Sequence, residues 1–138
     1  MIVVDSSIIV KWIKADEVDS GKARIIYDQY KANKVQIIVP QFVFIELANY
    51  LVTKSRTTIN HIRKLINFLI NLGLEIHQIK DNEIVEATLL AKKSGTTVYD
   101  MLYAVVANKH KVLLITADEK FIKKTKFPFV KLLSEYPV

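Results

Sequence analysis

Cysteine is absent from the 138 residues, so the chain forms neither disulfides nor metal sites with thiolate ligands. Glycine is scarce, and Gly21, Gly73 and Gly95 are too scattered for a P-loop or a dinucleotide-binding fingerprint. Apolar runs all fall short of the roughly 20 residues that cross a membrane. We therefore expect a cytoplasmic protein that has no membrane partner.

The composition suits one compact folding unit. Hydrophobic residues make up 51% of the sequence, and we expect a single domain over residues 1–138. The formal net charge is +6, from 20 basic and 14 acidic side chains. A basic surface attracts polyanions such as nucleic acid, but many soluble proteins are basic, so the charge alone selects no function.

Short apolar runs alternate with amphipathic stretches of helical periodicity along the chain. The runs predict strands at residues 1–4, 35–39, 74–79, 112–115 and near 129–133. The amphipathic stretches predict helices at 8–13, 16–32, 41–54, 57–72 and 82–94, one around Asp100, and a short basic one after Asp118. Strands separated by helices imply an α/β fold with a mainly parallel sheet that is covered on both faces.

The helices at 41–54 and 57–72 are expected to form a helical hairpin. In the first of them, three residues at helical spacing are expected to face the core: Ile45, Ala48 and Val52. The second has more apolar surface than one packing face needs, including Leu65, Phe68 and Ile70. This hairpin is therefore a candidate contact with a second subunit.

Four acidic residues lie within apolar sequence: Asp5, Glu46, Asp100 and Asp118. Asp5 and Asp118 each follow a predicted strand, and the carboxyl ends of parallel strands meet at one edge of a sheet. Glu46 and Asp100 fall early in their helices, near the same edge. A desolvated carboxylate needs a positive partner, and no lysine or arginine is adjacent to Asp100 or Asp118, so a metal ion would meet that need.

The remaining acids and the histidines are expected to have ordinary roles. Glu83 and Glu86 are expected on the outer side of their helix. The three histidines, His61, His77 and His110, lack metal-ligand spacing and are expected at the surface or in the core with satisfied hydrogen bonds.

Each of the four embedded acids also has a plainer interpretation. Asp5 can serve as a helix N-cap, Asp100 and Asp118 can stabilise helix dipoles, and Glu46 can sit at a helix edge in water. Four such acids, spread over the whole chain and all at strand ends or helix starts, favour a shared site.

Several short motifs occur in a fixed order. They are Asp5-Ser6 after the first strand, Pro40 and Glu46 with Asn49, Val98-Tyr99-Asp100 before a helix with small residues, and Thr116-Ala117-Asp118-Glu119-Lys120-Phe121. In this order and spacing the chain resembles PIN-domain ribonucleases, and most closely the VapC-type toxins of toxin–antitoxin pairs. The resemblance covers essentially all 138 residues.

The resemblance implies a Rossmann-like three-layer α/β/α sandwich and an acidic endoribonuclease site that uses Mg²⁺ or Mn²⁺. It also implies a homodimer and a VapB-like antitoxin partner. Matched motif by motif, the catalytic residues are Asp5, Glu46, Asp100 and Asp118. Ser6, Asn49 and Thr116 fall at supporting positions, and Glu119 is the only candidate for a further acid near the last motif.

Oxygen ligands select hard cations, so we expect Asp5, Asp100 and Asp118 to hold the ion and Glu46 to position or deprotonate the attacking water. Three lysines near the site are candidates for contacts to the RNA backbone: Lys111, Lys120 and Lys123. Any one of them can equally be an ordinary solvated surface residue.

Two other classes remain open. One is a catalytically inert RNA-binding module. The other is a receiver-like phosphoacceptor domain, which fits less well because the strand at 35–39 ends in Val39-Pro40 instead of an aspartate.

Overall fold

A five-stranded sheet, in the order β3-β2-β1-β4-β5, forms the centre of the computed structural model, which describes residues 1–137. All neighbouring strands are parallel. The strands are β1 (Ile2–Val4), β2 (Ile37–Pro40), β3 (Glu75–His77), β4 (Leu113–Thr116) and β5 (Val130–Leu132). The inner strands are continuous apolar runs because helices bury both faces of the sheet.

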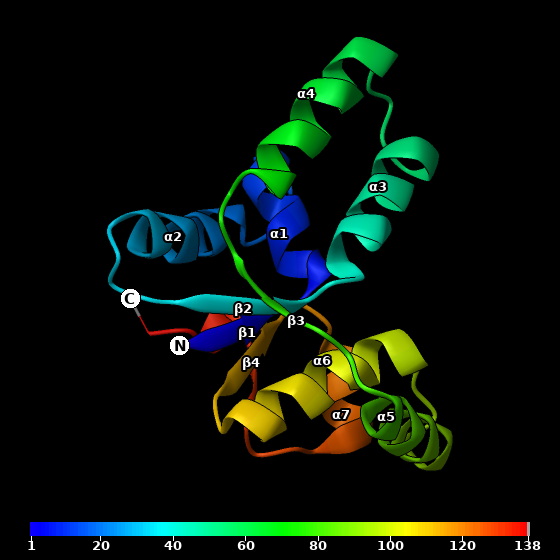
Figure 1. The fold of residues 1–138 in the computed structure, drawn as a ribbon. Helices are drawn as coiled ribbons and strands as arrows, with labels where there is room; N and C mark the ends of the chain where they lie inside the picture. The colour runs from blue at the N-terminus through cyan, green and yellow to red at the C-terminus, as the bar shows by residue number, and fades with distance from the viewer. Residues whose placement is uncertain (138) are drawn as a thin grey trace.

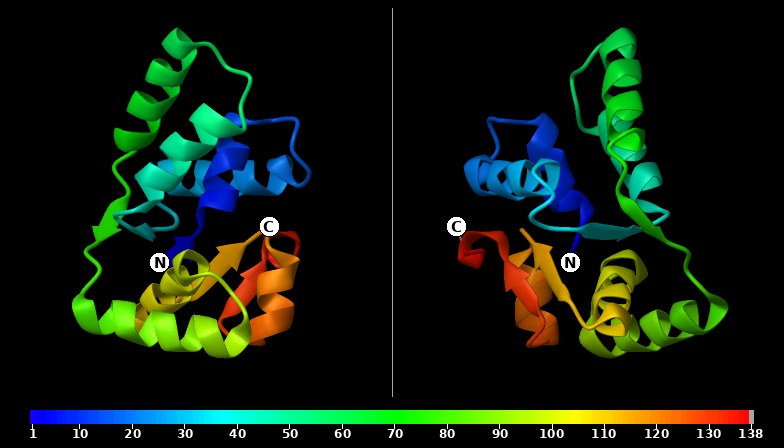
Figure 2. Two further views of the ribbon diagram at one scale, coloured as in Figure 1. Left: turned by 90° about the vertical axis from the view of Figure 1, so that its right-hand side faces the viewer. Right: turned by 60° about the vertical axis from the view of Figure 1, so that its left-hand side comes forward.

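Helices cover the two faces in separate groups (Figure 1). One group contains α1 (Ser6–Ile13), α2 (Ser20–Lys31), α3 (Val43–Thr53) and α4 (Ile59–Ile70). The other contains α5 (Asp81–Ser94), α6 (Val98–His110) and α7 (Glu119–Thr125), and a short 3₁₀ helix, η1 (Leu133–Glu135), follows β5. The predicted three-layer α/β/α sandwich is confirmed. Figure 2 shows that α4 extends away from the sheet. Within residues 1–137, every helix is too short or too polar to span a bilayer.

The strand order changes direction at β1, which lies in the middle of the sheet. The chain first adds β2 and β3 on one side of β1, then crosses through α5 and α6 to add β4 and β5 on the other. Val4 of β1 pairs with Ile115 of β4, so these two strands end level with one another. In open parallel sheets the crevice at such a reversal is where ligands bind.

Helix α6 packs across this reversal, against β1, β2 and β4. Seven consecutive residues, 101–107, are buried in it, and Ala104 and Ala107 allow the helix to approach the sheet closely. The buried α6 and β4 therefore form the centre of the core, with Asp100 at the amino end of the helix.

The structure corrects the prediction for α3. Its buried face consists of Val43, Leu47 and Leu51, whereas Ile45 and Val52 are 73% and 71% exposed. The prediction was wrong because α3 is apolar around most of its circumference, so periodicity does not identify the stripe that meets the core. Helix α2 begins at Ser20, later than predicted, because Asp19 has a left-handed backbone with φ of 60°.

Glu83 is also placed differently from the prediction, because it is buried at 2% exposure. One carboxylate oxygen lies 2.6 Å from His77 Nε2 and the other accepts a hydrogen bond from Lys109 Nζ at 3.0 Å. His77 Nδ1 lies 3.0 Å from His110 Nε2. His77 is thus a core histidine with satisfied hydrogen bonds, as predicted, and this network joins β3, α5 and α6.

Candidate active site

Asp5 connects β1 to α1, and both oxygens of its carboxylate accept hydrogen bonds. Oδ1 accepts hydrogen bonds from the Ser7 hydroxyl at 2.5 Å and the Ile8 amide at 3.3 Å, and Oδ2 accepts one from the Thr116 hydroxyl at 2.5 Å. Burial, and to a lesser extent the charge of Asp100, raise the pKa of Asp5 to about 6 against the lowering effect of these bonds. The carboxylate is therefore well ordered but costly to ionise.

Two hydroxyls join the ends of β1 and β4 around this carboxylate. Besides Asp5, Thr116 Oγ1 contacts the Asp118 amide, which donates to it at 3.0 Å. Ser7 Oγ likewise accepts from the Ala117 amide at 3.1 Å. Ser7 donates to Asp5, and Ser6, the supporting hydroxyl expected from the sequence, lines the adjacent cleft together with Ser7.

Glu46 comes from the first turn of α3 and is held by a buried tyrosine of α6. Its Oε1 accepts a hydrogen bond from the Tyr103 hydroxyl at 2.6 Å, and Tyr103 is 1% exposed. Burial raises the pKa of Glu46, the Tyr103 bond lowers it, and the charges of Asp100 and Asp5 raise it. Sequence reasoning missed Tyr103. The available signal was its position three residues after Asp100, on the same side of a helix.

Asp100 and Asp118 occupy helix starts. Asp100 follows the N-cap Thr97, whose hydroxyl accepts from the Asp100 amide at 3.2 Å, and burial together with the charge of Asp118 raises the pKa of Asp100. Asp118 caps α7 by accepting from the Phe121 amide at 3.0 Å. Asp5 and Asp118 are thus helix caps as well as members of the acidic group, so the plain interpretation and the functional one apply together.

Glu119 and Lys111 do not join this group. Glu119 is a surface residue of α7 whose side chain is 69% exposed and lies 4.0 Å from Lys123 Nζ. Lys111 lines a separate hollow of about 480 Å³ with Met1 and Phe129. The predicted position of Lys111 near the site is wrong. Asp100 and Lys111 lie at opposite ends of α6, so Lys111 lies near the amino ends of the strands and the acidic group near their carboxyl ends. Lys120 and Lys123 lie on α7, which starts at the site.

An open cleft of about 770 Å³ borders the acidic group. Glu46, Asn49 and Asp118 contribute polar groups to its wall. Asn49 is exposed on α3, one turn after Glu46. The cleft therefore gives solvent and a large ligand direct access to these carboxylates.

The four acids act on one another electrostatically and have no cation beside them. Asp100 influences the pKa of both Asp5 and Glu46, and Asp118 influences that of Asp100. Among residues 1–137, none of the four has a lysine or arginine nitrogen within ion-pair distance. Two carboxylates about 4 Å apart at an effective dielectric of 20 repel by roughly 4 kcal/mol, so such a group favours protons or a cation.

The donor chemistry of this group fits a hard divalent cation, because every side-chain ligand it offers is oxygen. Its geometry is not that of an assembled metal site: over residues 1–137, no three acidic or histidine side chains are arranged to hold one ion. An ion bound here would have to draw the carboxylates together.

Residues 2–127 match the PIN domain family, and the chain belongs to that family. No curated protein sequence matches it. The fold is also found in solved structures of low sequence identity. One is a toxin–antitoxin complex from Klebsiella pneumoniae, with a TM-score of 0.68 and 16% identity over 100% of both chains.

Two further structures have the same fold. VapC20 from Mycobacterium tuberculosis, described as a sarcin–ricin loop cleaving toxin, has a TM-score of 0.67 and 13% identity over 89% of this chain and 94% of its own. VapBC2 from Rickettsia felis, bound to a promoter DNA fragment, has a TM-score of 0.63 and 24% identity over 96% of this chain and 97% of that one.

The stability of Asp5→Asn relative to the native protein should rise with pH. The pKa of Asp5 rises on folding from 3.8 to about 6, so its stabilising effect is complete below pH 3.8 and lost as the pH rises through 6. Asparagine does not ionise, so Asp5→Asn does not lose stability in this way. The difference in free energy of unfolding between Asp5→Asn and the native protein should therefore shift in favour of the variant by up to about 3 kcal/mol between pH 4 and 7.5. Urea unfolding over this range measures the difference.

The control is Asp28→Asn, which alters an exposed pair with Arg24 and should change stability by less than about 0.5 kcal/mol throughout. If the stability difference between Asp5→Asn and the native protein does not change with pH, folding does not raise the pKa of Asp5.

Tyr103→Phe removes one hydroxyl and leaves the packed ring in place. Loss of its hydrogen bond should raise the pKa of Glu46 further and lower the free energy of unfolding by about 1–3 kcal/mol. NMR titration of the Glu46 carboxyl measures the first effect and urea unfolding the second. Tyr136→Phe, which removes a hydroxyl that donates to Gln29, should leave the pKa of Glu46 unchanged; an unchanged titration in Tyr103→Phe as well would show that the bond does not act on Glu46.

Proposed function

We propose that this PIN-domain protein is an endoribonuclease that depends on Mg²⁺ or Mn²⁺ and hydrolyses RNA phosphodiester bonds. The observation that carries the proposal is the group of four mutually influencing carboxylates, without a neighbouring cation, at the point where the strand order reverses. A site with several uncompensated carboxylates beside an open cleft suits a divalent cation and an anionic substrate together.

The four acids divide into two roles in this mechanism. Asp5, Asp100 and Asp118 would hold the cation, directly or through water, and the Ser7 and Thr116 hydroxyls would keep Asp5 in place. The bound cation supplies charge neutralisation at the phosphate.

Glu46 is suited to act on the attacking water. Tyr103 occupies Oε1 of Glu46, which leaves Oε2 to orient that water and accept its proton. Water attacks phosphorus in line, the bond to the ribose 3′ oxygen breaks, and the products carry a 5′ phosphate and a 3′ hydroxyl.

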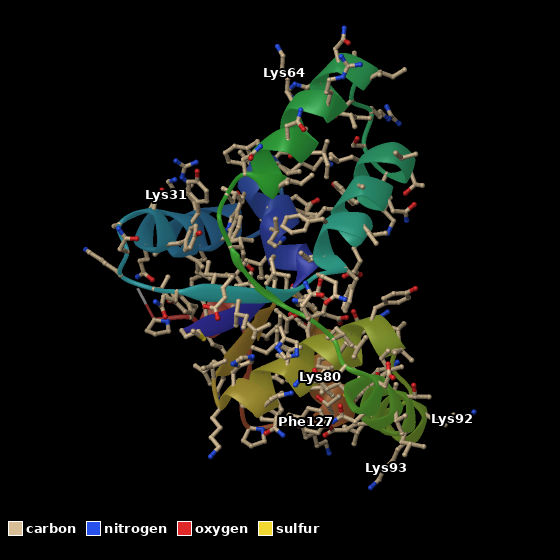
Figure 3. All side chains as sticks on the ribbon, in the orientation of Figure 1. Lys31, Lys64, Lys80, Lys92, Lys93 and Phe127 are labelled. Atoms are coloured by element: carbon tan, nitrogen blue, oxygen red, sulfur yellow. The ribbon has the colours of Figure 1, made fainter. Side chains whose placement is uncertain are left out.

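The basic surface would bind the RNA backbone. The net charge of +6 already includes the acids of the site, so the rest of the surface is more strongly positive. Figure 3 shows Lys64, Lys92 and Lys93 projecting away from the ribbon. Lys120 and Lys123, on the helix that starts at Asp118, are suited to contact phosphates next to the cut bond.

The biological role that we propose is the toxin of a VapBC-type toxin–antitoxin system in the cytoplasm. Support comes from the fold, which the chain shares with the toxin–antitoxin complexes described above. A VapB-like antitoxin would restrain the enzyme, and an antitoxin arginine is suited to the uncompensated acids. Addition of a candidate partner should then abolish RNA cleavage by the purified chain.

A second candidate function is an inert RNA-binding module. It is favoured by one observation: no three ligands are already arranged around an ion within the described residues 1–137. The receiver-like alternative is not favoured, because the strand order β3-β2-β1-β4-β5 differs from the 2-1-3-4-5 order of flavodoxin-like receivers.

A nuclease assay on a panel of structured RNAs separates enzyme from binding module. Native protein should cut in Mg²⁺ or Mn²⁺ and stop in chelator, and Asp5→Asn and Asp100→Asn should each lower the rate by at least about 100-fold. Asp28→Asn, an exposed acid far from the site in sequence, serves as the matched control and should cut like native. RNA binding without metal-dependent cleavage, unchanged by Asp100→Asn, would establish the inert module instead.

We also propose that the chain forms a homodimer through the α3–α4 hairpin. Four large apolar residues of the hairpin, all outside the cleft, are 43–80% exposed: Val52, Ile59, Phe68 and Ile70. Such a patch is typical of a protein interface. Sedimentation velocity should show a dimer for the native chain and a monomer for Ile70→Asp, and a native monomer at about 50 μM, far above the Kd of a stable dimer, would contradict the proposal.

A further inference from the structure

Tyr99 is an exposed aromatic residue beside the acidic group that the mechanism above does not use. It directly precedes Asp100 in the first turn of α6, is 59% exposed and lines the cleft. Exposure of a tyrosine at the mouth of a cleft leaves a large flat apolar surface in water. This surface is available to a planar ligand.

A ring contact with Phe42 restricts the orientation of the Tyr99 side chain. Phe42, just before α3, packs edge-on against Tyr99 with ring centroids 5.7 Å apart and against Tyr103 at 5.2 Å. Tyr99 and Tyr103 are four residues apart on α6 and so lie on one side of the helix. Because Tyr103 binds Glu46, this aromatic row places Tyr99 about one helical turn from the carboxylate that would activate water.

The cleft changes character along its length. The acids lie at one end, Ile45 lies 73% exposed in the wall that Tyr99 also lines, and α3 continues past them through Asn49 and Tyr50 to Lys54. The Lys14 ammonium lies 6.0 Å from the centroid of the Tyr50 ring at that far end. The same cleft therefore presents carboxylates, exposed apolar and aromatic side chains, and the basic Lys54, which are the kinds of group that suit a cut phosphate, a nucleobase and a neighbouring phosphate.

We propose that Tyr99, together with Ile45 of the same cleft, forms a subsite that stacks the nucleobase next to the phosphate cut by this enzyme. The inference rests on the proposed nuclease function and adds a substrate requirement to it. Stacking on an aromatic side chain needs a base whose face is free, so the subsite selects an unpaired nucleotide and rejects one inside a duplex. Tyr99 therefore sets the preference for single-stranded RNA without taking part in the chemistry.

The test uses fluorescence of 2-aminopurine placed centrally in a single-stranded oligoribonucleotide of eight uridines. Titration with Asp100→Asn protein in Ca²⁺ should quench the fluorescence, because the probe base stacks on Tyr99 while cleavage is disabled. Adding Tyr99→Ala should remove the quenching and weaken binding about tenfold, whereas Tyr99→Phe and Tyr99→Trp should retain both. A blunt RNA duplex, which offers no free base, should bind equally with and without Tyr99→Ala.

The matched control is Leu89→Ala on α5, because Leu89 is 67% exposed and lies outside the cleft. It should bind the probe like the parent. Unchanged probe affinity and quenching in Tyr99→Ala would overturn the subsite, and equal losses for probe and duplex would overturn it by assigning Tyr99 a structural role. If native protein cuts no RNA while quenching still depends on Tyr99, the nuclease proposal fails and the subsite stands.

Discussion

Three hydrogen bonds to the carboxylate of Asp5, from Ser7, Ile8 and Thr116, hold a half-buried negative charge at the place where β1 and β4 end. These bonds lower the pKa of Asp5, but burial outweighs them and leaves it near 6. The protein thus orders the carboxylate without neutralising it. The other acids of the group raise the free-energy cost of ionising Asp5. This uncompensated negative charge is the constraint on which the site depends.

The fold explains why such a costly arrangement persists. The level ends of β1 and β4 fix Asp5 and Asp118, while α3 and α6 approach from opposite faces of the sheet and fix Glu46 and Asp100. Buried α6 crosses the sheet at the reversal of strand order, so the core itself sets the positions of the acids. Stability elsewhere offsets the local repulsion, and a bound cation would relieve it.

The parts of the structure that follow from short-range patterns could be predicted from sequence. Apolar runs located the strands, and alternation with helices gave the parallel three-layer fold. The four acids were found because carboxylates embedded in apolar sequence are unusual. The buried face of α3 was missed because Val52 and Leu51 are equally apolar, and only the tertiary packing decides between them. Tyr103 was missed because its partner, Glu46, lies 57 residues away along the chain. Ser7 and Glu83 have partners close in sequence, Asp5 and His77, but only the fold determines which hydroxyl faces Asp5 and that Glu83 is buried.

The central claim is that Asp5, Asp100 and Asp118 together bind a divalent cation, which is separate from whether RNA is cut. Isothermal titration calorimetry with Mn²⁺ tests it most directly, on native protein and on Asp100→Asn at pH 7.5 and pH 5. The account predicts saturable binding by the native chain at pH 7.5 that weakens at pH 5, where Asp5 is mostly protonated, and that Asp100→Asn weakens at least about tenfold. Absence of Mn²⁺ binding to the native protein at pH 7.5, or binding that Asp100→Asn leaves unchanged, would contradict it.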